Sequence, residues 1–127
     1  MPSPKKRKQE KDRVKIGRSY EALAAHFFLD SGYLILNRNY RAGQKEIDLI
    51  VQKGNSLVFV EVKSASSTRF GHPAERVDKK KINNLIKAAQ QYLIENKIEG
   101  CDLRFDVVTF VGGELEHYPA AFEIEEN

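Results

Sequence analysis

The sequence predicts a single α/β domain with a mixed β-sheet flanked by helices, in the order αβββαβ followed by a short edge strand. Three observations predict this class. The chain has 127 residues, a length that suits one hydrophobic core. Two segments carry apolar residues at helical spacing, whereas others are short apolar runs bounded by turn-forming residues. The 41% hydrophobic and 31% charged residues are typical of a globular domain.

The first predicted helix covers residues 17–32. Its apolar residues recur at i, i+3, i+4, i+7 and i+8, and they are Tyr20, Leu23, Ala24, Phe27 and Phe28. Gly32 is a natural end for this helix. Because each residue turns a helix by about 100°, Glu21 falls beside Phe28 at the border of the apolar face. The helix therefore presents a carboxylate next to its buried side.

Three strands are predicted after this helix, over residues 33–41, 46–52 and 57–63. The segments AGQ and KGNS between them are typical turn sequences, so the three strands are expected to form an antiparallel meander. Residues 64–77 show little periodicity and contain several loop-forming residues, which predicts a surface loop.

The second half of the domain begins with a helix over about residues 78–96. Its expected buried residues are Ile82, Leu85, Ile86, Ala89, Tyr92 and Leu93. A further strand over 103–111, a Gly-Gly turn and a short edge strand over 114–119 follow. Arg104 and Asp106 share a face of the longer strand, and we interpret them as a structural ion pair. His117, on the edge strand, is interpreted as a residue without a catalytic role.

Charge is distributed unevenly along the chain. Residues 1–18 hold eight Lys and Arg against two acidic residues, a net charge of +6, whereas the whole chain carries only +3, so the remainder is acidic. We expect residues 1–16 to be a basic disordered arm, 17–122 the folded domain and 123–127 an acidic tail. The arm is interpreted equally as a nucleic-acid contact or as a solubilising segment.

Several protein classes are excluded by composition. The apolar runs are far shorter than the roughly 20 residues that span a membrane, so we expect no membrane association. Cys101 is the single cysteine, which excludes an internal disulfide framework and a thiolate metal site. A cytoplasmic setting is the simplest expectation.

Three charged residues lie inside apolar strand sequences, where an ionised group is costly unless something compensates it. They are Asp48, Glu61 and Lys63. Glu61 and Lys63 are two residues apart, so both project from one face of their strand. In a hairpin around the KGNS turn, Asp48 comes near the end where Glu61 emerges. We therefore expect these charges to line the edge of a cleft rather than the hydrophobic core.

This arrangement favours metal-assisted phosphodiester hydrolysis. Two neighbouring carboxylates repel each other and attract a divalent cation, and oxygen ligands favour Mg²⁺ or Mn²⁺ over Zn²⁺. Such a metal activates water and neutralises charge on the phosphoryl oxygens. Lys63 would orient the nucleophile or stabilise the transition state, and Glu21 would be a further ligand or support one. Alone, a Glu-x-Lys pair is also common on exposed sheet faces.

Other polar residues surround this set. Arg69, in the predicted loop, and Lys81, at the start of the second helix, are candidates to contact a nucleic-acid backbone. Glu46 shares a face with Asp48, so it is a candidate further ligand, although we favour its interpretation as a surface residue.

A wider set of motifs resembles the YraN-type family of uncharacterised bacterial proteins. The motifs are GRSYEALAAHFFLDSGYLILNRNYR, EIDLI, LVFVEVK, FGHPAE, RFDVV and a closing AF, from about Gly17 to Phe122. This family is related to restriction-endonuclease-like PD-(D/E)XK nucleases, including archaeal Holliday-junction resolvases. The resemblance implies a restriction-endonuclease-like core. The residues that it equates with the nuclease site are Glu21, Asp48, Glu61 and Lys63.

The chain departs from this family pattern at two positions. Lys45 stands where a glycine is usual, and Ala65 stands where an arginine is usual. Neither position is an expected metal ligand, but loss of the arginine would weaken a phosphate or substrate contact.

The function that these residues favour is a metal-dependent nuclease acting on DNA, including branched recombination or repair intermediates. One alternative is a non-catalytic module that binds nucleic acid or a protein partner on the same fold. Another is a structural adaptor whose polar strand face is an interface. Because junction-cutting relatives act as dimers, the resemblance also suggests a homodimer.

Overall fold

The structure is a computed structural model that describes residues 19–69, 71–72 and 77–122. A first helix over residues 19–30 comes before the other elements. These are β1 (Leu34–Ala42), β2 (Lys45–Lys53), β3 (Ser56–Ala65), α2 (Lys79–Glu95), β4 (Asp102–Val111) and β5 (Glu114–Phe122). The predicted α/β class and order of elements are confirmed. The predicted basic arm and acidic tail lie outside the described residues.

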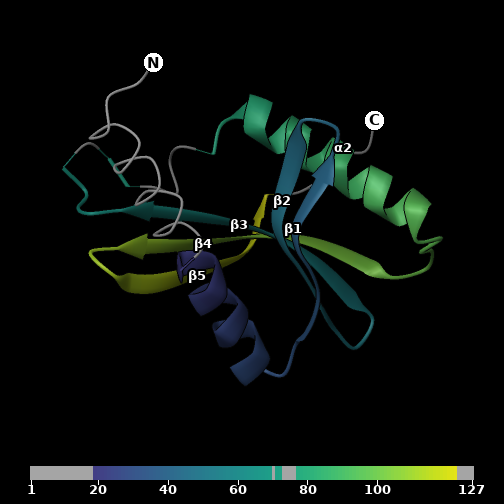
Figure 1. Cartoon of the computed structure of the whole chain (residues 1–127), viewed down its shortest axis with the longest axis horizontal. Coiled ribbons are helices and arrows are strands. Elements are labelled where there is room, and N and C mark those ends of the chain that lie inside the picture. Colours follow the sequence, from purple (N-terminus) through teal and green to yellow (C-terminus); the bar gives the residue numbers. More distant parts are fainter. Residues whose placement is uncertain (1–18, 70, 73–76, 123–127) are drawn as a thin grey trace, which may run out of the picture.

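The strands form one mixed sheet in the order β1-β2-β3-β4-β5 (Figure 1). β1, β2 and β3 pair antiparallel, as the meander predicted, and β4 pairs antiparallel with β5. β3 and β4 pair in parallel, because α2 crosses over between them. β3 is therefore the central strand, with an antiparallel neighbour on one side and a parallel neighbour on the other.

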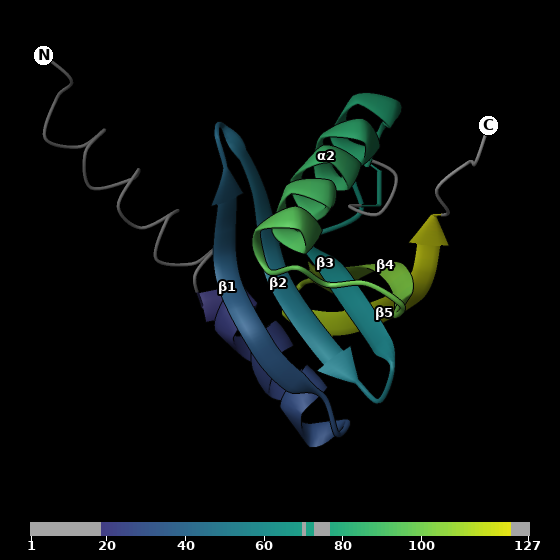
Figure 2. The same ribbon diagram turned by 90° about the vertical axis from the view of Figure 1, so that its right-hand side faces the viewer.

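The two helices cover opposite faces of the sheet (Figures 1 and 2). One hydrophobic cluster joins the first helix to the sheet, and its buried residues are Ala24, Ala25, Phe28, Leu49, Val51, Val58, Val60, Val108 and Phe110. The other joins α2 to the sheet, and its buried residues are Ile47, Ile50, Leu57, Phe59, Leu85, Ala88, Ala89, Tyr92 and Phe105. Both faces of β2, β3 and β4 are thus buried, which explains their nearly continuous apolar sequences.

The first helix is rotated relative to the predicted apolar face. Leu23 was expected to be buried, but it is 52% exposed, whereas Ala25 is only 7% exposed. The buried face is therefore the one that carries Ala25 and Phe28. Glu21 belongs to that face, because residues at i, i+4 and i+7 share one side of a helix. The rotation brings the Glu21 carboxylate toward the sheet.

An ion pair between the half-buried Arg104 and the buried Asp106 ties β4 to its surroundings, as the sequence predicted. Arg104 Nε donates to Asp106 Oδ1 and Arg104 Nη2 donates to Asp106 Oδ2, both at 2.8 Å. The Asp106 carboxylate also lies 2.7 Å from His117 Nε2 and accepts from the backbone N–H of Ala120. Arg104 Nη2 in turn donates to the hydroxyl of Tyr33. His117 therefore has a structural role in linking β5 to β4.

Among the described residues, no helix is both long and apolar enough to cross a membrane.

Candidate metal site at the divergence of two central strands

The two central strands separate at the predicted site. β2 and β3 are paired as far as Leu49 and Val60. Beyond that point β2 stays paired with β1, and β3 stays paired with β4 (Figure 1). Asp48 and Glu61 are the first residues past the separation. Diverging strands leave backbone groups without their ladder partners, and side chains can approach them there.

The Asp48 side chain replaces one of the backbone hydrogen bonds that the separated strands lack. Its Oδ2 accepts a hydrogen bond of 2.8 Å from the backbone N–H of Val62 on β3. Ile47 packs in the α2 cluster and Leu49 in the first-helix cluster, although residues two apart on a regular strand face the same side. The strand is therefore irregular at Asp48, and this residue lies between the two faces of the sheet.

Glu61 faces α2 and is held by two lysines. Lys63 Nζ lies 3.3 Å from Glu61 Oε1, which confirms that these two side chains share a face. Lys81 Nζ, from the first turn of α2, also lies 3.3 Å from Glu61 Oε1. The second oxygen, Oε2, is buried and has no hydrogen-bond partner. The two lysines therefore hold Oε1 of Glu61, and Oε2 remains available to another partner.

The predicted cleft position is wrong for Glu61. This residue is only 3% exposed, and Lys81 of α2 and Lys63 of β3 both contact its carboxylate. Asp48 and Lys63 are half-buried. A sequence shows which side chains share a strand face, but it does not show how closely a helix will pack over them.

Three carboxylates gather near the point where β2 and β3 separate, and one of them comes from the first helix. Oxygen atoms of Glu21, Glu46 and Asp48 all lie within 4.8 Å of one another. Glu21 comes from the first helix, and its Oε2 is buried and has no hydrogen-bond partner. Glu46, for which the sequence left a surface role and a ligand role open, belongs to this cluster. Its shared face with Asp48 was the signal in the sequence.

The crowded carboxylates change their own acidity. Burial raises the pKa of Asp48 to about 8, with further upward contributions from the charges of Glu61 and Glu21. The Val62 N–H and the ammonium of Lys81 act in the opposite direction. Burial is also the main reason that the pKa of Glu21 is raised. A proton or a cation would relieve the repulsion among these groups.

The donor set fits a hard divalent cation. The carboxylate oxygens in this region include two buried ones without partners, Glu21 Oε2 and Glu61 Oε2. Mg²⁺ binds oxygen at about 2.0–2.1 Å, so small side-chain movements would bring the Glu21, Glu46 and Asp48 oxygens around one ion. Oxygen ligands of this kind suit Mg²⁺ or Mn²⁺.

The two predicted nucleic-acid contacts lie in different surroundings. Lys81 is at the site itself, through its contact with Glu61. Arg69 is exposed in the segment that follows β3, where its backbone N–H donates to Ser67 Oγ. The structure thus brings Lys81 together with the central residues and places Arg69 past the end of β3.

The acidity of Asp48 gives a first testable prediction. In the absence of metal ions, we expect the protein to lose stability as pH rises from the ordinary pKa of this group, 3.8, toward about 8. The folded protein holds the Asp48 proton more tightly than the unfolded chain. Its contribution is therefore complete below pH 3.8 and is lost as pH rises through about 8. Denaturant unfolding in EDTA at several pH values measures this.

Asp48→Asn should remove that pH dependence, so the variant gains stability relative to the parent as pH rises. Asp102→Asn, at the exposed start of β4, serves as the matched control and should follow the parent. A constant difference between Asp48→Asn and the parent at every pH would contradict the prediction.

Comparison with known proteins finds a consistent set of relatives. A model of the family described as "Uncharacterised protein family UPF0102" matches residues 20–110, a range that contains every proposed site residue. The chain is 40% identical over 114 residues to a UPF0102 protein of Sulfurihydrogenibium sp. (strain YO3AOP1), with 90% of this chain and 99% of the relative covered.

Two further relatives carry the same description. A UPF0102 protein of Chloroherpeton thalassium is 48% identical over 98 residues, covering 77% of this chain and 76% of the relative. One from Persephonella marina is 39% identical over 109 residues, covering 86% and 94%. These descriptions name no activity.

Proposed function

The chain belongs to the uncharacterised YraN-type family UPF0102, and from that premise we propose that it is a metal-dependent nuclease that hydrolyses phosphodiester bonds in DNA. One observation carries the proposal. Where β2 and β3 separate, Asp48 and Glu61 lie with Lys63 beside them, and one oxygen of Glu61 is buried without a hydrogen-bond partner. An unpartnered buried carboxylate oxygen is costly, which supports a cation as its missing partner.

Each residue of the site would have a distinct role. Asp48 and Glu61 would hold the metal, and Glu21 and Glu46, whose oxygens lie close to those of Asp48, would complete or support its ligand set. A bound Mg²⁺ or Mn²⁺ would lower the pKa of its water and stabilise charge on the phosphoryl group. Lys63, whose ammonium lies 3.3 Å from Glu61 Oε1, would orient the attacking water and offset the charge that develops on the phosphate.

The experiment is a cleavage assay with the full chain. Duplex, single-stranded and branched DNA, and RNA of the same sequence, are each incubated with Mg²⁺, Mn²⁺ or EDTA. We expect cleavage of DNA that requires the metal and is absent in EDTA. No cleavage of any of these substrates would sink the proposal, as would cleavage that Lys63→Ala leaves undiminished.

A second function is favoured by the charge balance at Glu61. Two lysines already contact this carboxylate, so its charge is compensated without a metal ion. A protein that binds nucleic acid on this fold without cutting it would also need such cations. DNA binding that weakens with salt and survives the combined variant Asp48→Asn/Glu61→Gln, in the absence of metal binding, would favour this function.

The contact between Lys81 and Glu61 gives a second prediction. Lys81→Gln removes a cation that repels a metal ion, so we expect Mn²⁺ to bind about 10-fold more tightly, a change of about 1.4 kcal/mol. The same variant should raise KM for DNA, because Lys81 is also placed to contact phosphate. Calorimetry measures the metal affinity and a cleavage assay measures KM.

Lys80→Gln is the matched control, since Lys80 is exposed on the same turn of α2. It should leave Mn²⁺ affinity close to that of the parent. Weaker Mn²⁺ binding by Lys81→Gln would contradict the prediction. It would mean that Lys81 positions the Glu61 carboxylate for the metal ion and does not compete with the ion for it.

A further inference from the structure

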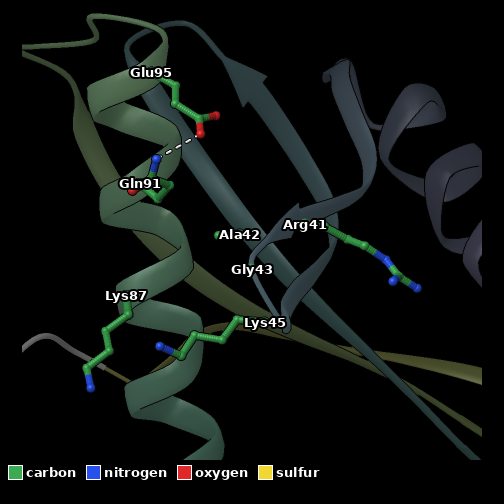
Figure 3. A pocket seen from close by; sticks show the side chains of 7 residues that line it. All are labelled: Arg41, Ala42, Gly43, Lys45, Lys87, Gln91 and Glu95. Atoms are coloured by element: carbon green, nitrogen blue, oxygen red, sulfur yellow. Dashed lines mark hydrogen bonds between the residues drawn. The ribbon is translucent and has the colours of Figure 1, made fainter.

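A hollow of about 480 Å³ lies between the β1–β2 turn and α2, apart from the carboxylate site. We call it the hairpin–helix hollow, and its lining residues are Arg41, Ala42, Gly43, Lys45, Lys87, Gln91 and Glu95. Figure 3 shows Lys45 reaching from β2 toward α2, where Lys87 projects, whereas Arg41 points away from α2. The hollow therefore presents two ammonium groups from separate elements.

The charge of the hollow is positive at one end. Within the described residues, neither Lys45 nor Lys87 has a carboxylate oxygen within 4.0 Å of its ammonium. The one acidic residue of the lining is Glu95. Gln91 Nε2 donates to its Oε1 and the hydroxyl of Tyr40 donates to its Oε2, both at 2.8 Å. Glu95 is thus occupied at the far end of the hollow, and the two lysines are left to face an anion (Figure 3).

The hollow is continuous in the chain with the carboxylate site. Lys45 directly precedes Glu46, whose carboxylate lies with those of Glu21 and Asp48. On α2, residues at i, i+4, i+7 and i+11 share one side, and here they form a polar stripe of Lys80, Asn84, Lys87 and Gln91. The stripe contains no acidic residue and begins on the same turn as Lys81, which contacts Glu61.

The dimensions of this stripe suit a polynucleotide. Lys80 and Lys87 are seven positions apart in the helix, which corresponds to about 10 Å along its axis. One strand of DNA advances about 3.4 Å per nucleotide, so this distance corresponds to about three nucleotides. Lysines and amide side chains are typical contacts for successive phosphates, and they position a strand without reading its sequence.

We propose that the hairpin–helix hollow binds phosphate groups of a nucleic-acid strand, which continues along the polar stripe of α2 to the carboxylate site. This inference rests on the proposed function, because the strand is taken to run toward the carboxylate site where it would be cut. Lys45 and Lys87 are binding residues in this scheme and take no part in hydrolysis.

The test measures binding of the full chain to fluorescently labelled DNA by anisotropy, in EDTA so that no cleavage occurs. We expect Lys45→Gln/Lys87→Gln to raise Kd about 10-fold. Because two phosphate contacts are lost, the slope of log Kd against log salt concentration should fall by about 1.4 for single-stranded DNA or about 1.8 for duplex DNA.

The matched control is Lys53→Gln/Lys97→Gln, which removes the same charge at the opposite end of β2 and beyond the end of α2. Thermal unfolding checks that both double variants fold, since Lys53 also donates to the backbone carbonyl of Ser31. An equal loss of affinity and slope in both variants would overturn the proposal, because it would reflect net charge alone. Absence of DNA binding by the parent would overturn it as well.

The two proposals fail in different ways. If the protein cuts DNA while the hollow variant binds with the Kd of the parent, the hollow is refuted and the nuclease stands. If the hollow variant loses binding while no form of the protein cuts DNA, the hollow stands and the nuclease is refuted.

Discussion

Asp48→Asn is expected to lower kcat/KM for DNA cleavage by about 10³-fold at saturating Mg²⁺, equivalent to about 4 kcal/mol of transition-state stabilisation. The asparagine keeps an oxygen that can accept from the Val62 N–H, so the local backbone arrangement is preserved. What it removes is the negative charge that would hold the metal between the separated strands. Single-turnover cleavage assays over a range of Mg²⁺ concentrations measure the loss.

The control for this prediction is Asp102→Asn, which changes the same charge at the exposed start of β4. It should cut DNA at the rate of the parent. Restoration of Asp48→Asn to the parent rate by excess Mg²⁺ would show that the residue only tunes metal affinity. Activity within a few fold of the parent at every Mg²⁺ concentration would exclude Asp48 as a metal ligand.

The largest effect on stability is expected at Asp106, which is not one of the proposed metal ligands. The residue is 1% exposed, and its carboxylate joins Arg104, His117 and the Ala120 N–H. Asp106→Ala leaves the guanidinium and the imidazole without their shared partner, which typically costs roughly 3–5 kcal/mol. Since Arg104 is partly exposed and can regain water, we expect the lower part of that range. Denaturant unfolding measures the change.

A matched variant distinguishes the stability lost with this network from the stability lost by removing any acidic residue from β4. Asp102→Ala removes an exposed carboxylate from the same strand, and such surface changes usually stay within about 0.5 kcal/mol. Asp106→Asn should fall between the two, because it keeps hydrogen-bonding atoms but loses the charge. A loss below about 1 kcal/mol for Asp106→Ala would mean that Arg104 finds an equivalent partner.

Much of the fold followed from local patterns. The strands of the meander were predicted to within about two residues, because alternating apolar runs and Gly-containing turns constrain neighbouring residues directly. The second helix was predicted almost to its ends, where Asp78 caps the first turn by accepting from the N–H of Lys81. The pairing of Glu61 with Lys63 followed in the same way from the period of a strand.

The first helix shows where such patterns stop. Leu23 belongs to the predicted apolar stripe and Ala25 borders it, and only packing against the sheet decided that Ala25 would be buried and Leu23 exposed. A small side chain lets the helix approach closely, and the resulting rotation brings Glu21 to Asp48 and Glu46. Helical periodicity defines the direction of an apolar face only to within a residue or so.

The sequence by itself determined the class of the fold, the order of its elements and the presence of acidic and basic residues in the central strands. These features depend on neighbours in the chain, and they could be inferred from residue type and spacing. Only the tertiary structure decided that β2 and β3 separate after Leu49 and Val60, and that Lys81 of α2 closes over Glu61. Both depend on contacts between segments far apart in the chain, whose geometry is set by how the helices pack on the twisted sheet.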